Sequence, residues 1–391
     1  MLEGKSVTIV GAGIGGLTAA LALAARGAQV RVLEQAGAIS EVGAGLQITP
    51  NGVAVLDALG LAAKLREIGL QVRAIELKDY QRGARVVRMD LARQNYLLLH
   101  RADLIGMLAQ AAERAGINVE LNKNVARVSE LGSGVEVELE SGHVEQVELL
   151  VGADGLHSKL RSELNGERKP FFTGQVAWRA IVPAEDANRR DVQVHMGPGR
   201  HVVTYPLRGG ELTNIVAVEE RSEWAAEGWN HPGDVGKLKQ AFSMFCPEIH
   251  GLLEQVEAVN VWGLFRHPVA DHWHGDRTAL LGDAAHPTLP FLAQGANMAL
   301  EDAWVLADCL SKMPVDQALP AYQARRRARV VRVIAAANAN ARNYHISQPI
   351  ARVAAHSILR FAGAVAPKQL QGKYDWVYQH DVTAGAGGRV A

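Results

Sequence analysis

The feature that most constrains this chain is a run of glycines between two apolar segments near its N-terminus. Ser6 to Val10 predicts a short strand, and Gly11-Ala12-Gly13-Ile14-Gly15-Gly16 follows it directly. An alanine-rich helix is then expected to about Arg26, and a second strand from Gln29 to Leu33 ends at Glu34. Strand, turn, helix and strand in this order are typical of α/β proteins.

The glycine run has the spacing of a dinucleotide-binding turn. In such a turn Gly11 allows the sharp bend, Gly13 lets the backbone approach a pyrophosphate, and Gly16 lets the helix pack closely on the strand. Glu34 lies 18 residues after Gly16 and is expected to accept the hydroxyl groups of an adenosine ribose. A carboxylate at this strand end also argues against a 2′-phosphate in the same site.

A second constraining stretch lies in the last third of the chain. Thr278 to Leu281 predicts a buried strand that is followed by Asp283, and ligands of open α/β sheets bind at the carboxyl ends of strands. Pro287 and Pro290 then force a turn before a helix that begins near Gly295. The start of that helix offers free N–H groups and a positive dipole end to an anion. The alternative is that this strand, turn and helix have only a structural role.

Three other segments are candidates for the same site. Leu149 to Val151 predicts a second strand that is followed by an acid, Asp154. Arg101 stands where a helix is expected to begin, and a phosphate contact and an exposed position fit it equally well. The segment from Gly43 to Asn51 is expected to be a loop leading into a short helix capped by Thr49, and its alternative is a plain connector.

The middle of the chain predicts an antiparallel sheet. Turns rich in Gly and Pro separate its expected strands, which we place at 176–182, 192–196, 201–207 and 212–218. The segment 74–80 is also strand-like. Alternation within one strand puts His201, Val203 and Tyr205 on one face, which could line a pocket. His and Tyr also pack at domain boundaries because they are amphipathic, and this second explanation stays open.

Composition excludes several classes of function. The 391 residues carry 41 basic and 41 acidic side chains, so no overall field attracts nucleic acid or an anionic membrane. The arginines from 325 to 332 are interpreted as a solvated or salt-bridged helix face. The two cysteines, Cys246 and Cys309, lie far apart, which fits a reducing cytoplasm and no metal site. No signal-type segment and no run of roughly 20 apolar residues is found, so we expect a cytoplasmic protein without a membrane span.

Three motifs together resemble one enzyme family. They are GAGIGG with Glu34, GADGLHSKLR at 152–161 and GDAAHPTLPFLAQGANMALED at 282–302. In this order they are similar to the single-component, FAD-dependent aromatic monooxygenases typified by salicylate, 3-hydroxybenzoate and 4-hydroxybenzoate hydroxylases. The resemblance covers about Val7 to Ala341. It implies an α/β fold in which a Rossmann-type FAD-binding domain is interleaved with an antiparallel β-sheet substrate domain and followed by C-terminal helices.

The resemblance also implies a division into domains. The FAD-binding domain is expected at 1–73, 97–175 and 265–310, and the substrate domain at 74–96 and 176–264. A C-terminal helical region at 311–382 and a disordered tail at 383–391 complete the chain.

The cofactor site follows from the same resemblance, with FAD as the cofactor and no metal. Gly11, Gly13, Gly16 and Glu34 would hold the ADP half, Arg101 and Asp283 the phosphate and ribitol region, Asp154 both FAD and NAD(P)H, and the N–H groups of Gly295, Ala296 and Asn297 the flavin edge. The chain has one dinucleotide fingerprint, so NADH or NADPH is expected as a transient co-substrate.

The implied reaction is hydroxylation of a small aromatic hydroxy acid, such as salicylate or a hydroxybenzoate, by O₂ through a flavin C4a-hydroperoxide. His201 and Tyr205 match the spaced His and Tyr of the 3-hydroxybenzoate 6-hydroxylase and 6-hydroxynicotinate 3-monooxygenase branch and are the expected catalytic residues. Gln47 and Phe291 stand where the latter enzyme has imidazoles, and with Pro290 they are expected in the substrate pocket. A larger ring, such as a quinone precursor or polyketide, is the alternative substrate, and a non-catalytic flavin sensor the remote one. A homodimer is left open.

Overall fold

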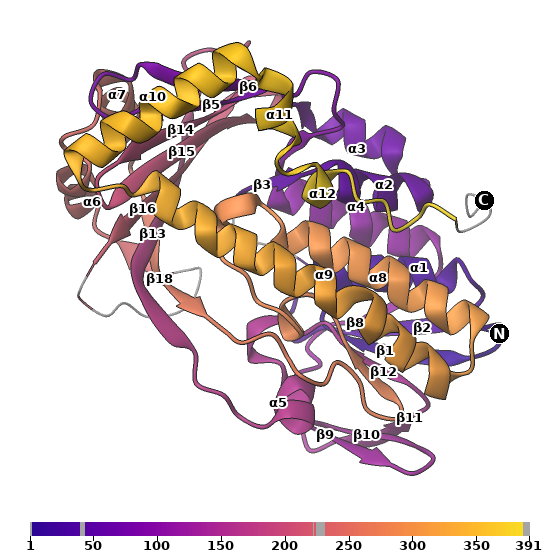
Figure 1. The fold of residues 1–391 in the computed structure, drawn as a ribbon. Coiled ribbons are helices and arrows are strands. Elements are labelled where there is room, and N and C mark those ends of the chain that lie inside the picture. Colours follow the sequence, from indigo (N-terminus) through magenta and orange to yellow (C-terminus); the bar gives the residue numbers. More distant parts are fainter. Residues whose placement is uncertain (1, 40–43, 222, 224–230, 386–391) are drawn as a thin grey trace.

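Two large β-sheets organise the computed structural model of the chain, which describes residues 2–39, 44–221, 223 and 231–385 (Figure 1). The first sheet is parallel, in the spatial order β19 (Thr278–Leu280), β12 (Leu150–Gly152), β1 (Ser6–Val10), β2 (Gln29–Leu33) and β8 (Asn118–Glu120). The strands that precede Glu34, Asp154 and Asp283 all belong to it. Because parallel strands end at the same edge, these three acids gather there.

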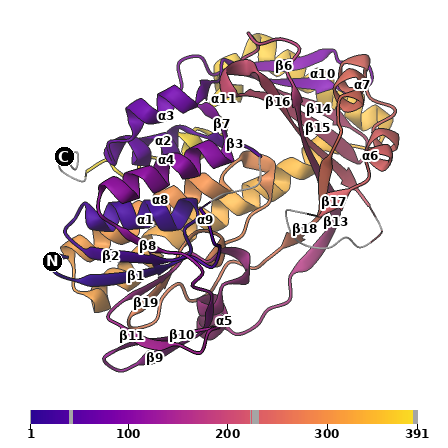
Figure 2. The same cartoon turned by 180° about the vertical axis from the view of Figure 1, so that it is seen from behind.

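Helices cover one face of this sheet and a three-stranded meander covers the other (Figure 1, Figure 2). On the helical side α1 (Ile14–Ala24) contacts both α4 (Arg101–Arg114) and α8 (Gly295–Lys312). On the other side are β9 (Val125–Leu131), β10 (Gly134–Leu139), β11 (Val144–Val147) and α5 (Lys159–Asn165). Alternation of side chains in β10 buries Val135, Val137 and Leu139 in the same apolar core as the sheet.

The second sheet has eight strands. Their spatial order is β17 (Pro232–Gly233), β18 (Val259–Arg266), β13 (Phe171–Pro183), β16 (Leu212–Glu220), β15 (Arg200–Leu207), β14 (Asp191–Gly197), β5 (Ala74–Asp79) and β6 (Arg85–Asp90). Neighbours are antiparallel except β14 and β5, where a hairpin from an earlier part of the chain joins in parallel. One face packs on α6 (Val235–Ala241) and α7 (Pro247–Glu254) around Trp178 and Phe242.

A small third sheet replaces part of the loop that was expected from Gly43. It consists of β4 (Leu70–Gln71), β7 (Leu97–His100) and β3 (Gly45–Ile48), with α2 (Pro50–Ala58) and α3 (Ala62–Ile68) beside it, while Gly43 lies outside the described residues. Thr49 occupies the position before α2, but the prediction that its side chain caps the helix is wrong. Its hydroxyl oxygen accepts instead from Gln294 Nε2 at 3.0 Å, and its proton is donated to Asn51 Oδ1 at 2.5 Å.

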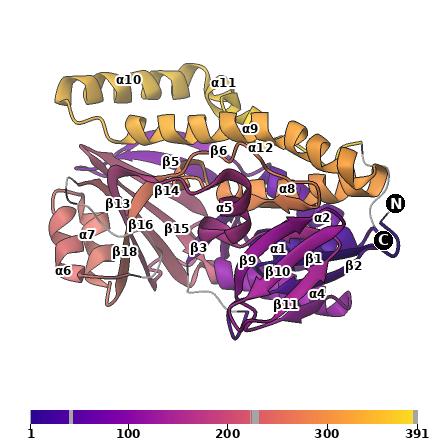
Figure 3. The same cartoon turned by 90° about the horizontal axis from the view of Figure 1, so that it is seen from below.

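The C-terminal helices join the two large sheets. α9 (Val315–Tyr344) packs on α8 and runs along one side of the molecule to the eight-stranded sheet, and α10 (Pro349–Val365) lies outside it against β6 (Figure 3). α11 (Pro367–Gly372) and α12 (Asp375–Tyr378) return towards α2. Of the expected disordered tail, residues 386–391 lie outside the described residues. In the part of the chain that the structure describes, no helix is long and apolar enough to span a membrane.

Candidate active site

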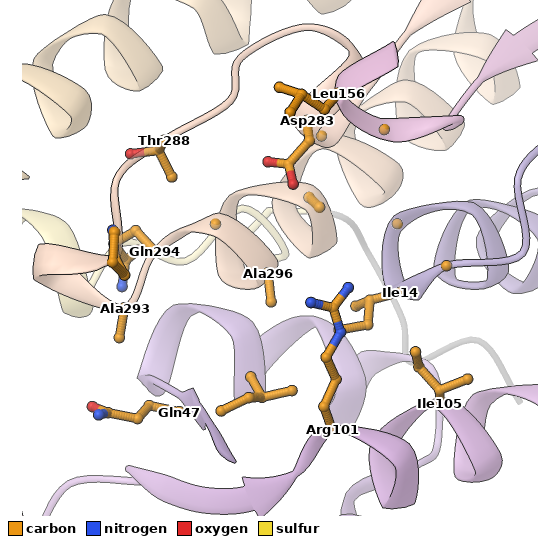
Figure 4. A pocket seen from close by; sticks show the side chains of 18 of the residues that line it. Ile14, Gln47, Arg101, Ile105, Leu156, Asp283, Thr288, Ala293, Gln294 and Ala296 are labelled. Atoms are coloured by element: carbon orange, nitrogen blue, oxygen red, sulfur yellow. The ribbon is translucent and has the colours of Figure 1, made fainter. Parts of the chain in front are cut away.

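A cavity of about 810 Å³ lies between the carboxyl edge of the parallel sheet and the inner face of the eight-stranded sheet. The predicted site residues that line it are Gly11, Gly13, Glu34, Gln47, Arg101, Asp154, His201, Tyr205, Asp283, Pro290, Phe291, Gly295 and Ala296. Gly16 and Asn297 stand behind its wall. Segments far apart in the sequence are thus brought to one cavity (Figure 4).

Each glycine of the turn after β1 has a distinct environment. Gly11 has a φ of +101°, and a Cβ there would lie 2.5 Å from the Ala153 carbonyl oxygen. At Gly16 a Cβ would lie 1.9 Å from the Gly11 carbonyl oxygen, so only glycine lets α1 approach β1. At Gly13, by contrast, a Cβ would meet nothing within 4 Å, because it would project into the cavity. This open backbone suits the close approach of a pyrophosphate.

Two backbone groups hold the Glu34 carboxylate at the end of β2. Its Oε2 accepts a hydrogen bond from Ala12 N at 2.7 Å, and its Oε1 accepts one from Ala36 N at 2.8 Å. Each carboxylate oxygen has a second lone pair for a further donor. The side chain is therefore oriented beside the glycine turn, where ribose hydroxyl groups would bind.

The acids after β12 and β19 both line the cavity. Asp154 Oδ2 accepts from Lys159 N at 3.0 Å, but its Oδ1 is buried and has no hydrogen-bond partner among the described residues. Asp283 faces the cavity, and its side chain is exposed to that open space while protein surrounds it on the other sides. Desolvation raises the pKa of both carboxyl groups, and for Asp283 the neighbouring His286 and Arg101 oppose the rise. A ligand hydroxyl group would satisfy each of them.

Arg101 and the start of α8 face each other across the cavity. Figure 4 shows the Arg101 side chain rising from α4 towards Ala296, with Asp283 above them. The first intrahelical bond of α8 runs from Met298 N to the Gln294 carbonyl, so the N–H groups of the three residues from Gly295 have no intrahelical acceptor. This edge of the cavity therefore combines a guanidinium group with a positive helix end, which suits an anionic cofactor.

Asn297 differs from its two neighbours because its side chain is buried behind the cavity wall. Its Oδ1 accepts from Thr49 N at 3.0 Å, and its Nδ2 donates to the carbonyl groups of Gln47 and Ala293 at 3.0 and 2.7 Å. The residue fastens α8 to β3. Any direct contact of Asn297 with a cofactor would therefore come from its backbone.

A buried ionic network beneath Asp283 was not predicted. Asp302 accepts from Gly282 N at 3.0 Å and lies 2.5 Å from His286 Nε2 and 2.7 Å from Arg326 Nε. Arg326 Nη1 also lies 2.6 Å from Glu301, and all three charged side chains are buried. The prediction that the arginine run is salt-bridged is correct for Arg326, and the alternative prediction of a solvated side chain is wrong for this residue. The sequence did contain a sign of this network, because two adjacent acids, Glu301 and Asp302, stand in an otherwise apolar helix.

The other end of the cavity is lined by the inner face of the eight-stranded sheet. His201, Val203 and Tyr205 face it together, as their alternation predicted. Arg179 lies in the same register row as Val203, since it pairs with Val216 of β16, which pairs with Val203. The Arg179 guanidinium lies 5.2 Å from the ring centre of Trp262. This wall thus offers a cation, an imidazole and a phenol to one ligand.

Burial lowers the pKa of His201 and raises that of Tyr205, so both side chains are held in their uncharged forms. The pKa of His201 is lowered well below its usual value by desolvation and by His345, so its imidazole is neutral and can accept a proton. Desolvation raises the pKa of Tyr205 to about 12, although Arg179 and Gln47 oppose it, so its phenol keeps its proton. Gln47 in turn accepts from the Tyr96 hydroxyl at 2.6 Å.

Aromatic side chains from the C-terminal helices close this end, and no sequence pattern predicted them. They are Tyr344, Tyr374 and Tyr378, with Asn340 and Gln371 beside them. The Tyr344 ring centre lies 5.3 Å from that of His201, and the Tyr374 hydroxyl donates to Asn340 Oδ1 at 2.7 Å. No short-range pattern marks such residues, because the helices reach the cavity only through the tertiary fold.

One group of side chains among the described residues could hold a metal ion, and it lies outside the cavity. The ligand atoms of His195, Cys246 and Glu248 are within 4.8 Å of one another. His195 alternates with the cavity-lining Val194 and therefore faces the opposite side of the sheet. Lys78 Nζ already lies 2.8 Å from Glu248 Oε2, so the place of a cation beside this carboxylate is taken. We assign no metal to it.

The FAD binding domain family matches residues 5–337 of the chain. The chain belongs to this family. The flavoprotein thereby has FAD as its cofactor, and the cradle described above fits it: an open glycine turn, a ribose-facing acid, an unsatisfied buried carboxylate oxygen and a cationic edge. Curated relatives and solved structures agree with this assignment.

The flavoprotein is 37% identical over 87% of its length to 3-amino-4-hydroxybenzoate 2-monooxygenase of Streptomyces cremeus, of which 88% is covered. It is 34% identical to 3-hydroxybenzoate 6-hydroxylase 1 of Aquipseudomonas alcaligenes, with 84% and 86% of the two chains covered. Klebsiella pneumoniae HpxO, solved with FAD and uric acid, superimposes with a TM-score of 0.82 at 27% identity, covering 91% and 93%. These relatives make the flavoprotein a monooxygenase.

Proposed function

We propose that this monooxygenase uses NADH or NADPH and O₂ to hydroxylate a small aromatic hydroxy acid. The observation that carries the proposal is the shared wall of Arg179, His201 and Tyr205. Arg179 lies two strands away from the strand that carries His201 and Tyr205. At a strand spacing of roughly 4.8 Å, this corresponds to about 10 Å. A benzoate-sized ligand fits that interval, with its carboxylate at Arg179 and its phenol at His201.

The size of the cavity favours a small substrate over a multi-ring one. Ligand pockets for a single drug-sized molecule commonly have roughly 300–1,000 Å³. The cavity of about 810 Å³ must hold a dinucleotide cofactor as well as the substrate. A quinone precursor or polyketide would not fit beside the cofactor in this volume, so we regard such a ring as the less favoured substrate.

His201 and Tyr205 have different tasks in this proposal. Bound FAD supplies the redox chemistry, taking a hydride from the reduced nicotinamide and delivering one oxygen atom of O₂ to the ring. His201 accepts the phenolic proton, which makes the ring more nucleophilic. Tyr205 stays protonated and donates a hydrogen bond to the substrate oxygen, which holds the ring in place. Gln47, Pro290 and Phe291 shape the pocket around it.

The cofactor contacts are proposed residue by residue. Gly11, Gly13, Gly16 and Glu34 serve the ADP half; Arg101, Asp154 and Asp283 the phosphate and ribitol region; and the backbone of Gly295, Ala296 and Asn297 the flavin. The single glycine fingerprint is taken by FAD, so we propose that the nicotinamide binds transiently without a domain of its own.

We propose the same division into domains as the sequence predicts, with a cofactor domain at 1–73, 97–175 and 265–310 and a substrate domain at 74–96 and 176–264. The two free, buried cysteines support a cytoplasmic location.

We further propose that two copies associate through α10. This helix exposes the large apolar side chains Ile350, Val353, Ile358, Phe361 and Val365, each at least 64% exposed. Monomeric proteins rarely expose so continuous an apolar face, and pairing the same helix across a two-fold axis would bury it. A membrane surface is the less favoured partner, because the Arg352 side chain turns back to within 5.2 Å of the Tyr80 ring centre.

A screen of aromatic acids tests the proposed function. The purified enzyme would be mixed with NADH or NADPH in air and with salicylate, 3-hydroxybenzoate, 3-amino-4-hydroxybenzoate or 6-hydroxynicotinate. At least one acid should stimulate nicotinamide oxidation and yield a hydroxylated product. Nicotinamide oxidation that no acid stimulates, or that proceeds equally without O₂, would remove the proposal and favour a flavin sensor.

A further inference from the structure

We propose that His345 and Glu220 continue from His201 as a proton relay, which carries the phenolic proton of the substrate from the closed cavity to solvent. The inference rests on the proposed function and adds two residues to it. Neither His345 nor Glu220 lines the cavity. Both would act through His201 and are therefore positioning and proton-transfer residues.

Three side chains form a continuous path from the cavity wall to the surface. His201 Nδ1 lies 2.6 Å from His345 Nε2, and His345 Nδ1 lies 2.9 Å from Glu220 Oε1. The His201 and His345 side chains are 2% exposed, whereas that of Glu220 is 51% exposed. A proton that leaves the cavity along this path reaches water at Glu220.

The order of partners determines where the protons are. Glu220 is an acceptor when ionised, so His345 Nδ1 carries a proton and donates it to Glu220. In neutral His345 the Nε2 is then a bare acceptor, and His201 Nδ1–H must donate to it. His201 Nε2 is consequently unprotonated, and it is the ring nitrogen left to accept a proton from a ligand in the cavity.

The transfer is balanced without any redox change. The substrate O–H bond breaks and its proton binds His201 Nε2, while the His201 Nδ1 proton moves to His345 Nε2. The His345 Nδ1 proton moves to Glu220 and on to water. The substrate is left as a phenolate and both imidazoles are neutral in their other tautomer. Reversal of the same shifts returns a proton when the product leaves.

The surroundings make such an exit necessary. His201 is packed against Phe291 and Tyr344, with ring centres 5.9 and 5.3 Å away, and a charged imidazole enclosed in this way is unfavourable. The groups that face His345 are Gln175 at 3.4 Å from Nδ1, Glu220, and Arg200, whose charge disfavours protonation. A proton held on either imidazole is therefore destabilised, and among the described residues Glu220 is the one acid in contact with the pair.

The backbone holds the outer end of the path in place. The His345 carbonyl accepts from Gly199 N at 3.3 Å, and the Gly199 carbonyl accepts from Glu220 N at 2.8 Å. The turn between β14 and β15 thus ties the segment after α9 to the end of β16. This arrangement fixes His345 between two groups on the sheet.

The test follows a chromophoric phenol in the FAD-loaded enzyme without NAD(P)H. The probe is 3-hydroxy-4-nitrobenzoate, whose phenolate absorbs visible light, mixed by stopped flow at a pH below the pKa of its phenol. Parent enzyme should form the phenolate rapidly, with a solvent deuterium isotope effect. His345→Gln should slow its formation about tenfold or more without weakening probe binding, since the base remains but its exit is lost. Glu220→Gln should slow it less, because this position is 51% exposed and solvent can take the His345 proton in place of the carboxylate.

Two controls separate the relay from mere packing. Added imidazole should restore the rate in His345→Ala, and His356→Gln, at a buried histidine outside the cavity, should leave the rate unchanged. A parent-like rate in His345→Gln, or a slow His345→Ala that imidazole does not restore, would overturn the relay. Failure of the proposed function would look different, because no aromatic acid would then stimulate nicotinamide oxidation in the parent enzyme.

Discussion

A side chain at position 13 would project into the cavity rather than into the protein, so this residue tests the cofactor cradle with little risk to the fold. Gly13→Val should abolish FAD retention by filling the place of the pyrophosphate. The flavin-to-protein absorbance ratio after purification measures it. Gly132→Val, at a turn residue that also has nothing within 4 Å of a Cβ, is the matched control and should retain FAD. Full occupancy in Gly13→Val would refute the assignment of the loop.

Asp283 is predicted to contribute to cofactor binding at a cost in stability. Asp283→Ala should weaken FAD binding on the order of tenfold or more, since a charged hydrogen bond is worth roughly 1.5–3 kcal/mol. Titration of the FAD-free protein with FAD, followed by flavin fluorescence, measures the dissociation constant. An unchanged constant would leave Asp283 with a structural role only.

The sign of the pH effect follows from the raised pKa of Asp283. A pKa that is higher in the folded state stabilises the fold below the unfolded-state pKa, and this contribution is lost as pH rises through the folded-state pKa. FAD-free Asp283→Asn should therefore melt at a higher temperature than the parent at neutral pH, and the difference should vanish near about pH 3. A variant that is less stable than the parent at neutral pH would contradict the raised pKa of Asp283.

At the scale of elements, the joint between α8 and α9 depends on Arg326. Arg326→Leu leaves Glu301 and Asp302 buried without their cation, so unfolding free energy should fall by about 3–5 kcal/mol. Arg327→Leu, one residue along and 40% exposed in its pair with Asp271, should cost far less. Denaturant unfolding of the two FAD-free variants compares them. Equal losses would mean that the buried network is not what holds α8 in place.

Sequence patterns predicted most elements because each has a local cause. Apolar runs that end at or near an acid predicted β2, β12 and β19, and alternation placed His201 and Tyr205 on one face of β15. The strand β3 was missed because its partner, β7, is far away in the chain and pairing of that kind has no local signature. His345 and Tyr378 were missed for the same reason.

Over the whole molecule, the exposed face of α10 predicts the assembly. Phe361→Glu should convert a dimer to a monomer, because it places a charge in the centre of the apolar face. Sedimentation velocity at several concentrations measures the change. Phe171→Glu, at a phenylalanine that is 66% exposed on β13, is the matched control and should leave the dimer intact. A parent protein that sediments as a monomer at all concentrations would remove this proposal.

In the proposed function, the wall of Arg179, His201 and Tyr205 activates an aromatic hydroxy acid beside the cofactor. Product, hydrogen peroxide and NAD(P)H consumed, all measured on one sample with the best acid from the screen, test it most directly. Loss of the base should leave NAD(P)H consumption intact, so His201→Ala should release peroxide in place of product, with coupled hydroxylation lower by roughly 10²–10⁴-fold. Tyr205→Phe should uncouple to a smaller extent. A product-to-NAD(P)H ratio that stays at the parent value in both variants would contradict the account.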